Sequence, residues 1–357
     1  MHEQARLLCV GHRFDRWQGM IAPYRYSEAF EDYFAATHRV AVLDASPIPS
    51  WALSGAGAGL VLDRLTMAAV AGLSAGTQVS SAMLRPDGTL VARVWVRREG
   101  DGGWLVSADA DVGALLEQAV DGNVRLEHRA RCALVLVGPH ADDLADALSQ
   151  WQAVEPWGPP IPHRGLAVSA LEGPALWASV FQQGEQWGIA PMGTECLEAL
   201  CIEAGAVLWP KHIDLEPTRD PAARTPSALG LEPHLLEVGD RDFVGAESAR
   251  TRLDDPDALV SCRLQVSAEM VEALYREEGR PPPHRPSPTR LSRALFSADG
   301  TDTVGRVLAQ VWSPRLKRFC LMAQVQRRHL QMPLRVEHRV GSSRRHLPAT
   351  VAHEGGL

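Results

Sequence analysis

Hydrophobic and polar positions follow two different periods along the chain. Apolar residues recur at helical spacing in Ser27–Arg39, and further helices are predicted after Gly59, from Val112, from His140, from Pro174 to about Trp187 and from Thr194 to Ala204. Alternation with a period of two predicts strands at WALSG from Trp51, on both sides of the Pro86–Gly88 turn, and at WLVSA from Trp104. Helices and antiparallel strands are therefore expected to mix through much of the chain.

The pattern changes after about Asp255. Four short segments with apolar alternation, separated by polar turns, are VSCRLQV, VGRVLAQVW, RFCLMAQV and LRVEHRV. The Pro-rich run Arg280–Pro288 lies among them, Leu215–Gly245 before them is loop-rich, and Gly158–Pro162 is a turn-rich break. Short strands with frequent turns predict a small barrel or a sandwich at the C-terminal end.

Length and composition indicate an ordinary globular protein. A chain of 357 residues usually forms two or three domains, and 45% hydrophobic with 22% charged residues excludes disordered and fibrous proteins. Apolar stretches stay short of a membrane span or a signal-peptide core, so we expect a cytoplasmic protein without a membrane partner. Six scattered cysteines without a CxxC pair are expected to be buried free thiols.

Charge is distributed unevenly. The net charge is −7, yet the residues from Ser261 onward hold 16 Lys or Arg against 8 Asp or Glu. This split indicates two differently charged modules and a possible docking face. The basic part lacks the aromatic residues of RNA-binding strands, so no nucleic acid partner is expected.

Local motifs do not identify a chemistry. GAGAG at Gly55–Gly59 lacks the spacing of a dinucleotide fingerprint, so it is interpreted as a tight strand-to-helix turn. Cys196 and Cys201 are five residues apart on a predicted helix, and the histidines form no HxxxH motif, so no metal site is expected. Acid pairs at Asp142–Asp143 and Asp254–Asp255 are assigned to a helix start and a turn.

A series of segments in a fixed order resembles one known family. VAVLDAS, SGAGAGLVLDRLT, LRPDGTLVARVWV, the run PALWASVFQQGEQWGIAPMGTECLEALCIEAG, TPSALGLEPHLLEVGDRDFVGAES and VGRVLAQVWSPRLKRFCLMAQV follow each other between Tyr24 and about Val351. They resemble the segments of the glycine-cleavage T-protein (aminomethyltransferase) family, which includes tetrahydrofolate-dependent demethylases. Most matching positions are turn glycines, prolines and core residues, which indicate the fold rather than the reaction.

The resemblance implies an α+β, T-protein-like tripartite fold, with two mixed α/β folate-binding domains and a C-terminal β-barrel. Its implied boundaries are residues 1–50 together with 130–255 for the first domain, 51–129 for the second, and 256–357 for the barrel.

The departures from the family lie at its functional positions. The hairpin that carries the family's acid pair has Ala92 and Arg93 here, and the His and Met of its "SHM" turn are replaced by Pro47 and Ile48. No equivalent is found for the family's carboxylate that pairs with the pterin ring, in the shortened stretch GPPIPHRGLAV. The catalytic residues therefore remain unknown.

The resemblance implies five residues at a tetrahydrofolate site. Asp44 and Ser46 are retained from the family's turn, Ile48 takes the place of its apolar wall, and Arg93 and Glu203 are the remaining candidates. Arg93 could hold the glutamate tail of folate or pair with a surface acid, and the pairing is favoured. Glu203 is interpreted as a structural partner of backbone amides near the pocket.

Formaldehyde condenses with tetrahydrofolate without a dedicated acid, so proximity could suffice. The chain is therefore interpreted as the subunit that captures formaldehyde from oxidative N-demethylation of a methylated amine as 5,10-methylene-tetrahydrofolate, in a complex with an amine-oxidising enzyme. Two alternatives stay open: a non-catalytic scaffold with a degenerate folate pocket, and a tetrahydrofolate-dependent O-demethylase. An iron–sulfur assembly role ranks last, because the cysteine of the "KGCxxGQE" segment is missing. Whether the protein is an enzyme on its own also stays open.

Overall fold

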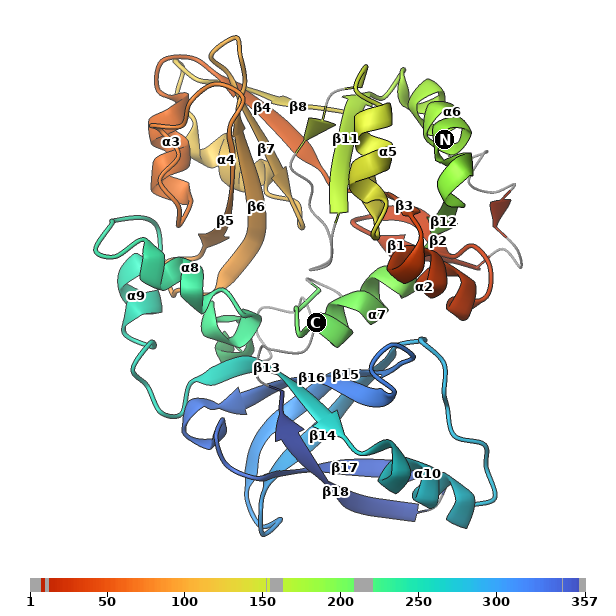
Figure 1. Ribbon diagram of the computed structural model, residues 1–357. Coiled ribbons are helices and arrows are strands. Elements are labelled where there is room, and N and C mark those ends of the chain that lie inside the picture. Colours follow the sequence, from red (N-terminus) through yellow and green to blue (C-terminus); the bar gives the residue numbers. More distant parts are fainter. Residues whose placement is uncertain are drawn as a thin grey trace. The chain divides into compact units, whose positions relative to one another are not determined.

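The computed structural model describes residues 8–9, 13–151, 153–154, 163–208, 221–341 and 343–352, without the side chains of 290–292. The chain divides into two compact units (Figure 1). The first contains Met1–Cys196 and His234–Ser248, and the second contains Leu197–Pro233 and Ala249–Leu357. The three-domain boundaries expected from the sequence stay a prediction.

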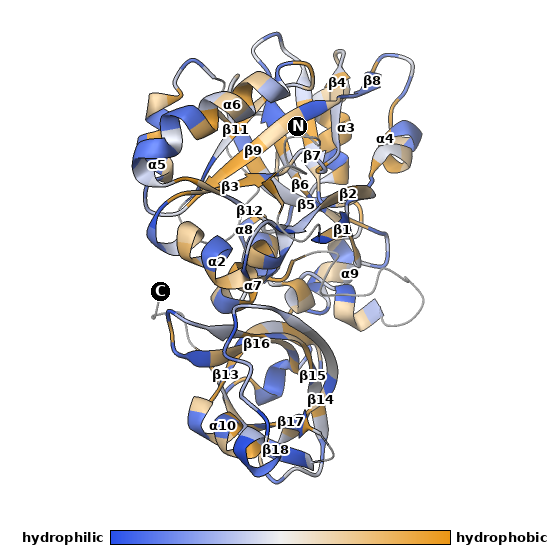
Figure 2. Cartoon of the chain, turned by 90° about the vertical axis from the view of Figure 1, so that its right-hand side faces the viewer, coloured by the Kyte–Doolittle hydropathy of each residue, from blue (hydrophilic) through white to orange (hydrophobic). Residues whose placement is uncertain are grey.

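One sheet of the first unit has five strands in the order β10-β11-β9-β3-β12. They are β3 (Ala41–Asp44), β9 (Arg131–Val137), β10 (Ala153–Val154), β11 (His163–Ser169) and β12 (Ala190–Met192). Neighbours pair antiparallel except β3 and β12, which are parallel. Apart from Asp44 at the end of β3 and Arg131 at the start of β9, both strands are hydrophobic (Figure 2), as expected at the centre of a sheet.

Helices cover this sheet and bury its apolar residues. The helices are α2 (Ala29–His38), α5 (Ala141–Ala147) and α6 (Gly173–Gly184), which continues into η1 (Glu185–Trp187). Leu144, Leu176 and Trp177 of α5 and α6 pack with Val42 and Leu136 of the sheet. A two-stranded hairpin, β1 (Arg13–Trp17) and β2 (Met20–Arg25), precedes α2.

The second sheet of this unit is entirely antiparallel, in the order β5-β6-β7-β4-β8. Its strands are β4 (Ser50–Ser54), β5 (Gln78–Leu84), β6 (Leu90–Arg98), β7 (Trp104–Ala108) and β8 (Arg125–His128), and its helices are α3 (Ala58–Leu65) and α4 (Gly113–Ala119). Strand β6 shows how the sequence pattern sets the two faces. Ala92, Val94 and Val96 belong to the core beneath the helices, so Arg93 and Trp95 lie on the opposite face.

The GAGAG segment is the expected strand-to-helix turn. Strand β4 ends at Ser54 and α3 begins at Ala58. Gly55 has φ +111°, and a side chain there would collide with the backbone carbonyl of Asn123. Glycine is therefore required by backbone geometry, without any ligand.

A closed barrel forms most of the second unit, in the order β13-β16-β15-β14-β17-β18. Its strands are β13 (Leu259–Val266), β14 (Thr289–Ser297), β15 (Thr303–Ser313), β16 (Arg318–Gln326), β17 (Leu334–Val340) and β18 (Ser343–Val351), with α10 (Ala268–Glu277) and η4 (Arg327–His329). Before the barrel come η2 (Pro221–Arg224) and η3 (Ser227–Leu229). The amide of Gln324 on β16 donates to the carbonyl oxygens of Ala223 and Ala228, each at 2.8 Å, and so attaches this segment to the barrel.

Three short elements span the division between the units: α7 (Thr194–Ala204), α8 (Glu232–Glu237) and α9 (Ala246–Arg250). The helix predicted from Thr194 to Ala204 is therefore confirmed. Part of the segment predicted to be loop-rich instead forms η2, η3 and α8, and its residues 215–220 lie outside the described residues. The predicted break at Gly158–Pro162 also lies outside them.

The predicted α+β class is confirmed, and the C-terminal region is a barrel rather than a sandwich. Sequence patterns missed α10, β14 and β18, because their buried positions are interrupted by arginine and other polar residues. All six cysteines are free and buried, as expected. No helix in the described ranges is long and apolar enough to span a membrane.

His338 on β17 is buried in the second unit, and its ring lies edge-on to Tyr275. Burial, together with the nearby charge of Arg293, lowers the pKa of His338 to about 4 from an ordinary 6.5. As the pH falls below 6.5, His338 is therefore protonated in the unfolded chain but stays neutral in the folded barrel. This coupling should cost about 2 kcal/mol of unfolding free energy at pH 5.

We predict that His338→Leu loses less stability than the wild type between pH 7.5 and pH 5, by about 2 kcal/mol. Denaturant unfolding of the full chain at both pH values measures the difference. His329→Asn, in the η4 turn of the same unit, is the control and should follow the wild type. Parallel pH dependence in His338→Leu and the wild type would contradict the assignment.

Candidate functional site

Asp44, Ser46 and Ile48 share one turn, which follows β3. The carboxylate of Asp44 accepts a hydrogen bond from the Ser46 amide at 3.0 Å, and the Ile48 amide donates to the Ala45 carbonyl at 3.0 Å. The turn is fixed to β9 because the Ala45 amide donates to the Ala133 carbonyl at 2.8 Å. The Ala133 amide in turn donates to the Ser46 hydroxyl at 3.2 Å. Asp44 and Ser46 therefore shape the turn that presents Ile48.

A cavity of about 60 Å³ opens beside this turn, between strands of the two sheets of the first unit. Its wall has apolar parts from Ile48, Leu134 and Val135, and hydroxyl groups from Ser46, Ser50 and Ser107. The hydroxyls of Ser50 and Ser107 lie 2.9 Å apart. Gln78, Trp95 and Arg131 also line the cavity, and no described lining residue carries a carboxylate. The cavity therefore has a mixed polar and apolar wall without a carboxylate among its described residues.

Arg93 is engaged by a buried acid. Its Nε lies 2.6 Å from Oδ2 of Asp109, and its backbone amide donates to Oδ1 of Asp109 at 2.8 Å. Asp109 is fully buried, and burial raises the pKa of its carboxyl group against the opposing effect of Arg93. The predicted pairing of Arg93 with a surface acid is therefore wrong in one respect, because the acid is in the interior.

Sequence reasoning missed Asp109, although a signal was present. Asp109 directly follows the buried strand β7, where a charged residue has to be compensated. Of the two positions that carry the family's acids, Ala92 faces the apolar core and only Arg93 faces the side of Trp95.

Glu203 belongs to the second unit. Its carboxylate oxygen Oε1 accepts from Nε and Nη2 of Arg315, at 2.8 and 2.7 Å. Its backbone carbonyl accepts from Arg263 at 2.6 Å. Glu203 is almost fully buried, and the guanidinium of Arg315 compensates the charge of its carboxylate. The contacts support the structural role that the sequence predicted, with arginine as the partner.

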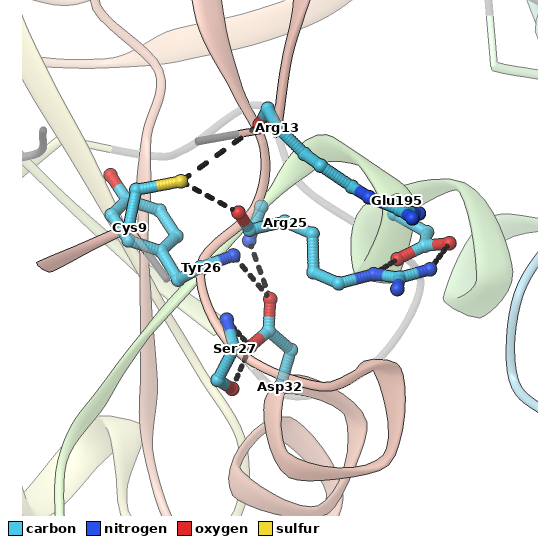
Figure 3. Close-up of polar contacts among 8 residues, drawn as sticks. Cys9, Arg13, Arg25, Tyr26, Ser27, Asp32 and Glu195 are labelled. Carbon is cyan, nitrogen blue, oxygen red and sulfur yellow. Dashed lines mark hydrogen bonds and ion pairs between the residues drawn. The ribbon is translucent and has the colours of Figure 1, made fainter. Parts of the chain in front are cut away.

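Asp32 is a second buried acid of the first unit, and it connects α2 to neighbouring segments by hydrogen bonds (Figure 3). Asp32 of α2 accepts hydrogen bonds from the Ser27 hydroxyl at 2.8 Å and from the amides of Tyr26 and Ser27, each at 3.3 Å. It also accepts from the Gly193 amide at 3.2 Å. Arg25 forms a bidentate pair with the buried Glu195. A side chain at Gly193 would collide with the Tyr24 backbone, which explains the retained glycine.

Fold and sequence now agree on the relationship. The chain superposes with the aminomethyltransferase T of the glycine cleavage system from Bartonella henselae with a TM-score of 0.77, over 99% of this chain and 95% of the other, at 19% identity. The family described as "GCVT N-terminal domain" matches residues 5–156. The chain is a divergent relative of the glycine-cleavage T-protein. The fold and the family resemblance predicted from the sequence are confirmed.

Two relatives from other bacteria are similar to this chain along much of its length. It is 24% identical to the aminomethyltransferase of Streptomyces avermitilis, over 90% of this chain and 87% of the other. It is 26% identical to a protein of Ectopseudomonas mendocina named the heme-dependent oxidative N-demethylase gamma subunit, over 68% of this chain and 70% of the other. The chain is thus aminomethyltransferase-like in sequence along most of its length.

The pair of Arg93 and Asp109 generates a prediction about stability. Arg93→Gln leaves the buried Asp109 carboxylate without its cation, so we expect the unfolding free energy to fall by about 3–5 kcal/mol. Adding Asp109→Asn should restore part of this loss, because an amide has no charge to compensate. Denaturant unfolding of the single and double variants measures both effects.

The control is Arg125→Gln, because Arg125 is 78% exposed and pairs with Glu127 at the surface. We expect a change below about 1 kcal/mol for it. An Arg93→Gln protein as stable as the wild type would show that the pair is not structural.

Proposed function

We propose that the protein binds tetrahydrofolate beside the Asp44–Ile48 turn and takes up formaldehyde released by oxidative N-demethylation of a methylated amine. The observation that carries the proposal is the absence of a carboxylate among the described residues of the cavity wall. A wall of hydroxyls and apolar groups suits a reaction that needs proximity rather than acid catalysis. The name of the Ectopseudomonas relative, a subunit of an oxidative N-demethylase, points to the same reaction.

The chemistry needs little from the protein. The N5 and N10 amines of tetrahydrofolate add to the carbon of formaldehyde, and the oxygen leaves as water, which gives 5,10-methylene-tetrahydrofolate. Holding the two reactants together replaces a bimolecular encounter by an intramolecular step. The serine hydroxyls of the wall can orient the polar edges of the ring, while Ile48 and Trp95 contact its faces.

The polar and apolar groups of the cavity wall suit a pterin ring, but the volume of the cavity does not. Ligand sites usually enclose about 300–1,000 Å³, and this cavity of about 60 Å³ is smaller. A pterin ring therefore enters only when side chains of the wall move. The polar groups that the ring needs are nevertheless present at the turn, on β4 and on β7.

The five predicted site residues receive different roles in this proposal. Ile48 and Ser46 form the wall, and Asp44 shapes the turn. Arg93 and Glu203 act as structural residues, because their charged groups are paired with Asp109 and Arg315. An amine-oxidising enzyme is the proposed partner in a heteromeric complex, as the source of formaldehyde.

A non-catalytic scaffold subunit is the second candidate. The observation that favours it is the engagement of Arg93 and of the Ser46 hydroxyl in internal contacts. An O-demethylase is less well supported, because activation of a methyl ether calls for a proton donor.

We predict that Ile48→Trp, which fills the cavity, weakens tetrahydrofolate binding at least tenfold without reducing stability by more than about 2 kcal/mol. Isothermal titration calorimetry under anaerobic conditions measures the affinity. Leu171→Ser is the control, because Leu171 is 94% exposed in the same unit. Formation of 5,10-methylene-tetrahydrofolate after addition of formaldehyde is then followed by absorbance, with and without protein.

Saturable tetrahydrofolate binding that is lost in Ile48→Trp and kept in Leu171→Ser supports the proposal. If the wild type does not bind tetrahydrofolate at near-millimolar concentration, the proposed function is rejected and the scaffold role remains. Pull-down from the native source tests the complex, and an isolated monomer that demethylates a substrate by itself would contradict it.

A further inference from the structure

Helix α2 exposes aromatic side chains on its outer face. Phe30 is 46% exposed and Phe34 is 50% exposed, whereas Tyr33 and Ala36 of the same helix are buried. Residues four apart lie on one face of a helix, one turn from each other. The His38 ring, a further four residues on, stacks on the Phe34 ring with their centroids 4.4 Å apart. Phe30, Phe34 and His38 therefore form one aromatic stripe.

Arg39 directly follows α2, and its guanidinium is held in place by neighbouring groups. Its Cζ lies 5.5 Å from the centroid of the Phe34 ring. On the other side it packs against Gly188, where an added Cβ would lie 3.1 Å from the Arg39 Cδ. The Nε atom of Arg39 is buried without a hydrogen-bond partner, and within the described residues its guanidinium forms no ion pair. A fixed guanidinium with unused donors favours an acid from another molecule.

Glu31 is the acid of the same surface. Glu31 and Arg39 both line a surface cavity of about 290 Å³, with Leu8 and Pro191. Glu31 is exposed and is not paired with Arg39 in the described part of the chain. Eight residues separate the two, which is about 12 Å along a helix. The acid and the cation therefore lie on one side of the aromatic stripe, at its opposite ends.

We propose that α2 is the contact between two copies of this chain, packed antiparallel about a two-fold axis beside Phe34. A two-fold interface brings the same surface of both copies together, so every contact between two different residues occurs twice. Antiparallel packing places Glu31 of one copy beside Arg39 of the other, and the reverse pair forms at the other end. The aromatic stripes then cover each other between the two ion pairs.

The order of the groups along α2 selects a second copy as the occupant. The midpoint between Glu31 and Arg39 falls at Ala35, so the two Phe34 rings meet close to the axis. Phe30 then faces the His38 ring of the other copy. An acid at the start of a helix and a cation at its end also suit the helix dipole, but the dipole does not call for exposed aromatic rings. The surface of α2 is thus complementary to itself in charge and in apolar character.

The size of this contact sets the expected affinity. One helix from each copy gives an interface at the low end of the usual range of buried area. We therefore expect a reversible dimer with a dissociation constant of about 10 μM.

The test is sedimentation velocity of the full chain from about 1 to 200 μM, a range that brackets the expected constant. Glu31→Arg alone brings like charges together at both ends of the contact, and so does Arg39→Glu alone. Each should weaken the dimer at least about tenfold. An equimolar mixture of the two variants has opposite charges in both pairs, so it should form a mixed dimer with the affinity of the wild type.

Two further variants separate the aromatic stripe from the general surface. Phe34→Ser should also weaken the dimer at least about tenfold, because it removes the apolar centre of the contact. Leu60→Ser is the matched control, since Leu60 is an exposed apolar residue of α3 in the same unit, and it should dimerise like the wild type. Denaturant unfolding checks that each variant is folded.

A wild type that stays monomeric over the whole range would overturn the inference, whatever the result with tetrahydrofolate. A dimer that is as strong in Phe34→Ser as in the wild type would place the contact elsewhere and overturn it as well. Loss of the dimer in both charge variants without recovery in their mixture would contradict the antiparallel pairing.

Discussion

A charge that leaves water has to be compensated inside the protein, and both units are organised by this constraint. The buried acids include Asp32, Asp109, Glu195, Glu198, Glu203 and Glu337. Asp32 is held by backbone amides and a hydroxyl, and Asp109, Glu195, Glu203 and Glu337 are paired with arginines. The high proportion of arginine among the basic residues suits this role, because its planar fork satisfies a carboxylate with two hydrogen bonds.

The same constraint explains how this fold accommodates an arginine, Arg93, at a position where the family resemblance implies an acid. By the resemblance, Arg93 takes the place of a family acid, and its charge is compensated by the buried Asp109. Charge is thus balanced within the sheet rather than by a ligand. The described wall of the cavity has hydroxyl, amide and apolar groups and one charged side chain, that of Arg131.

The sequence predicted most of the elements that have strong periodicity, such as α2, β6 and α7, because local spacing alone determines them. It also predicted the turn at Asp44–Ile48 through the family resemblance. It could not predict the partner of Arg93, since Asp109 is 16 residues away and meets it only across the pairing of β6 with β7.

The route of the chain between the two sheets has a consequence for the order of synthesis. The Arg129 amide donates to the Ser50 carbonyl at 2.8 Å, so the polypeptide enters and leaves the second sheet at adjacent points. All five strands of that sheet lie between residues 50 and 128, whereas β3 pairs with β9, which begins at residue 131. On the ribosome, the sheet encoded in the middle is complete first. Strand β3 stays unpaired with β9 until β9 is translated, about ninety residues later.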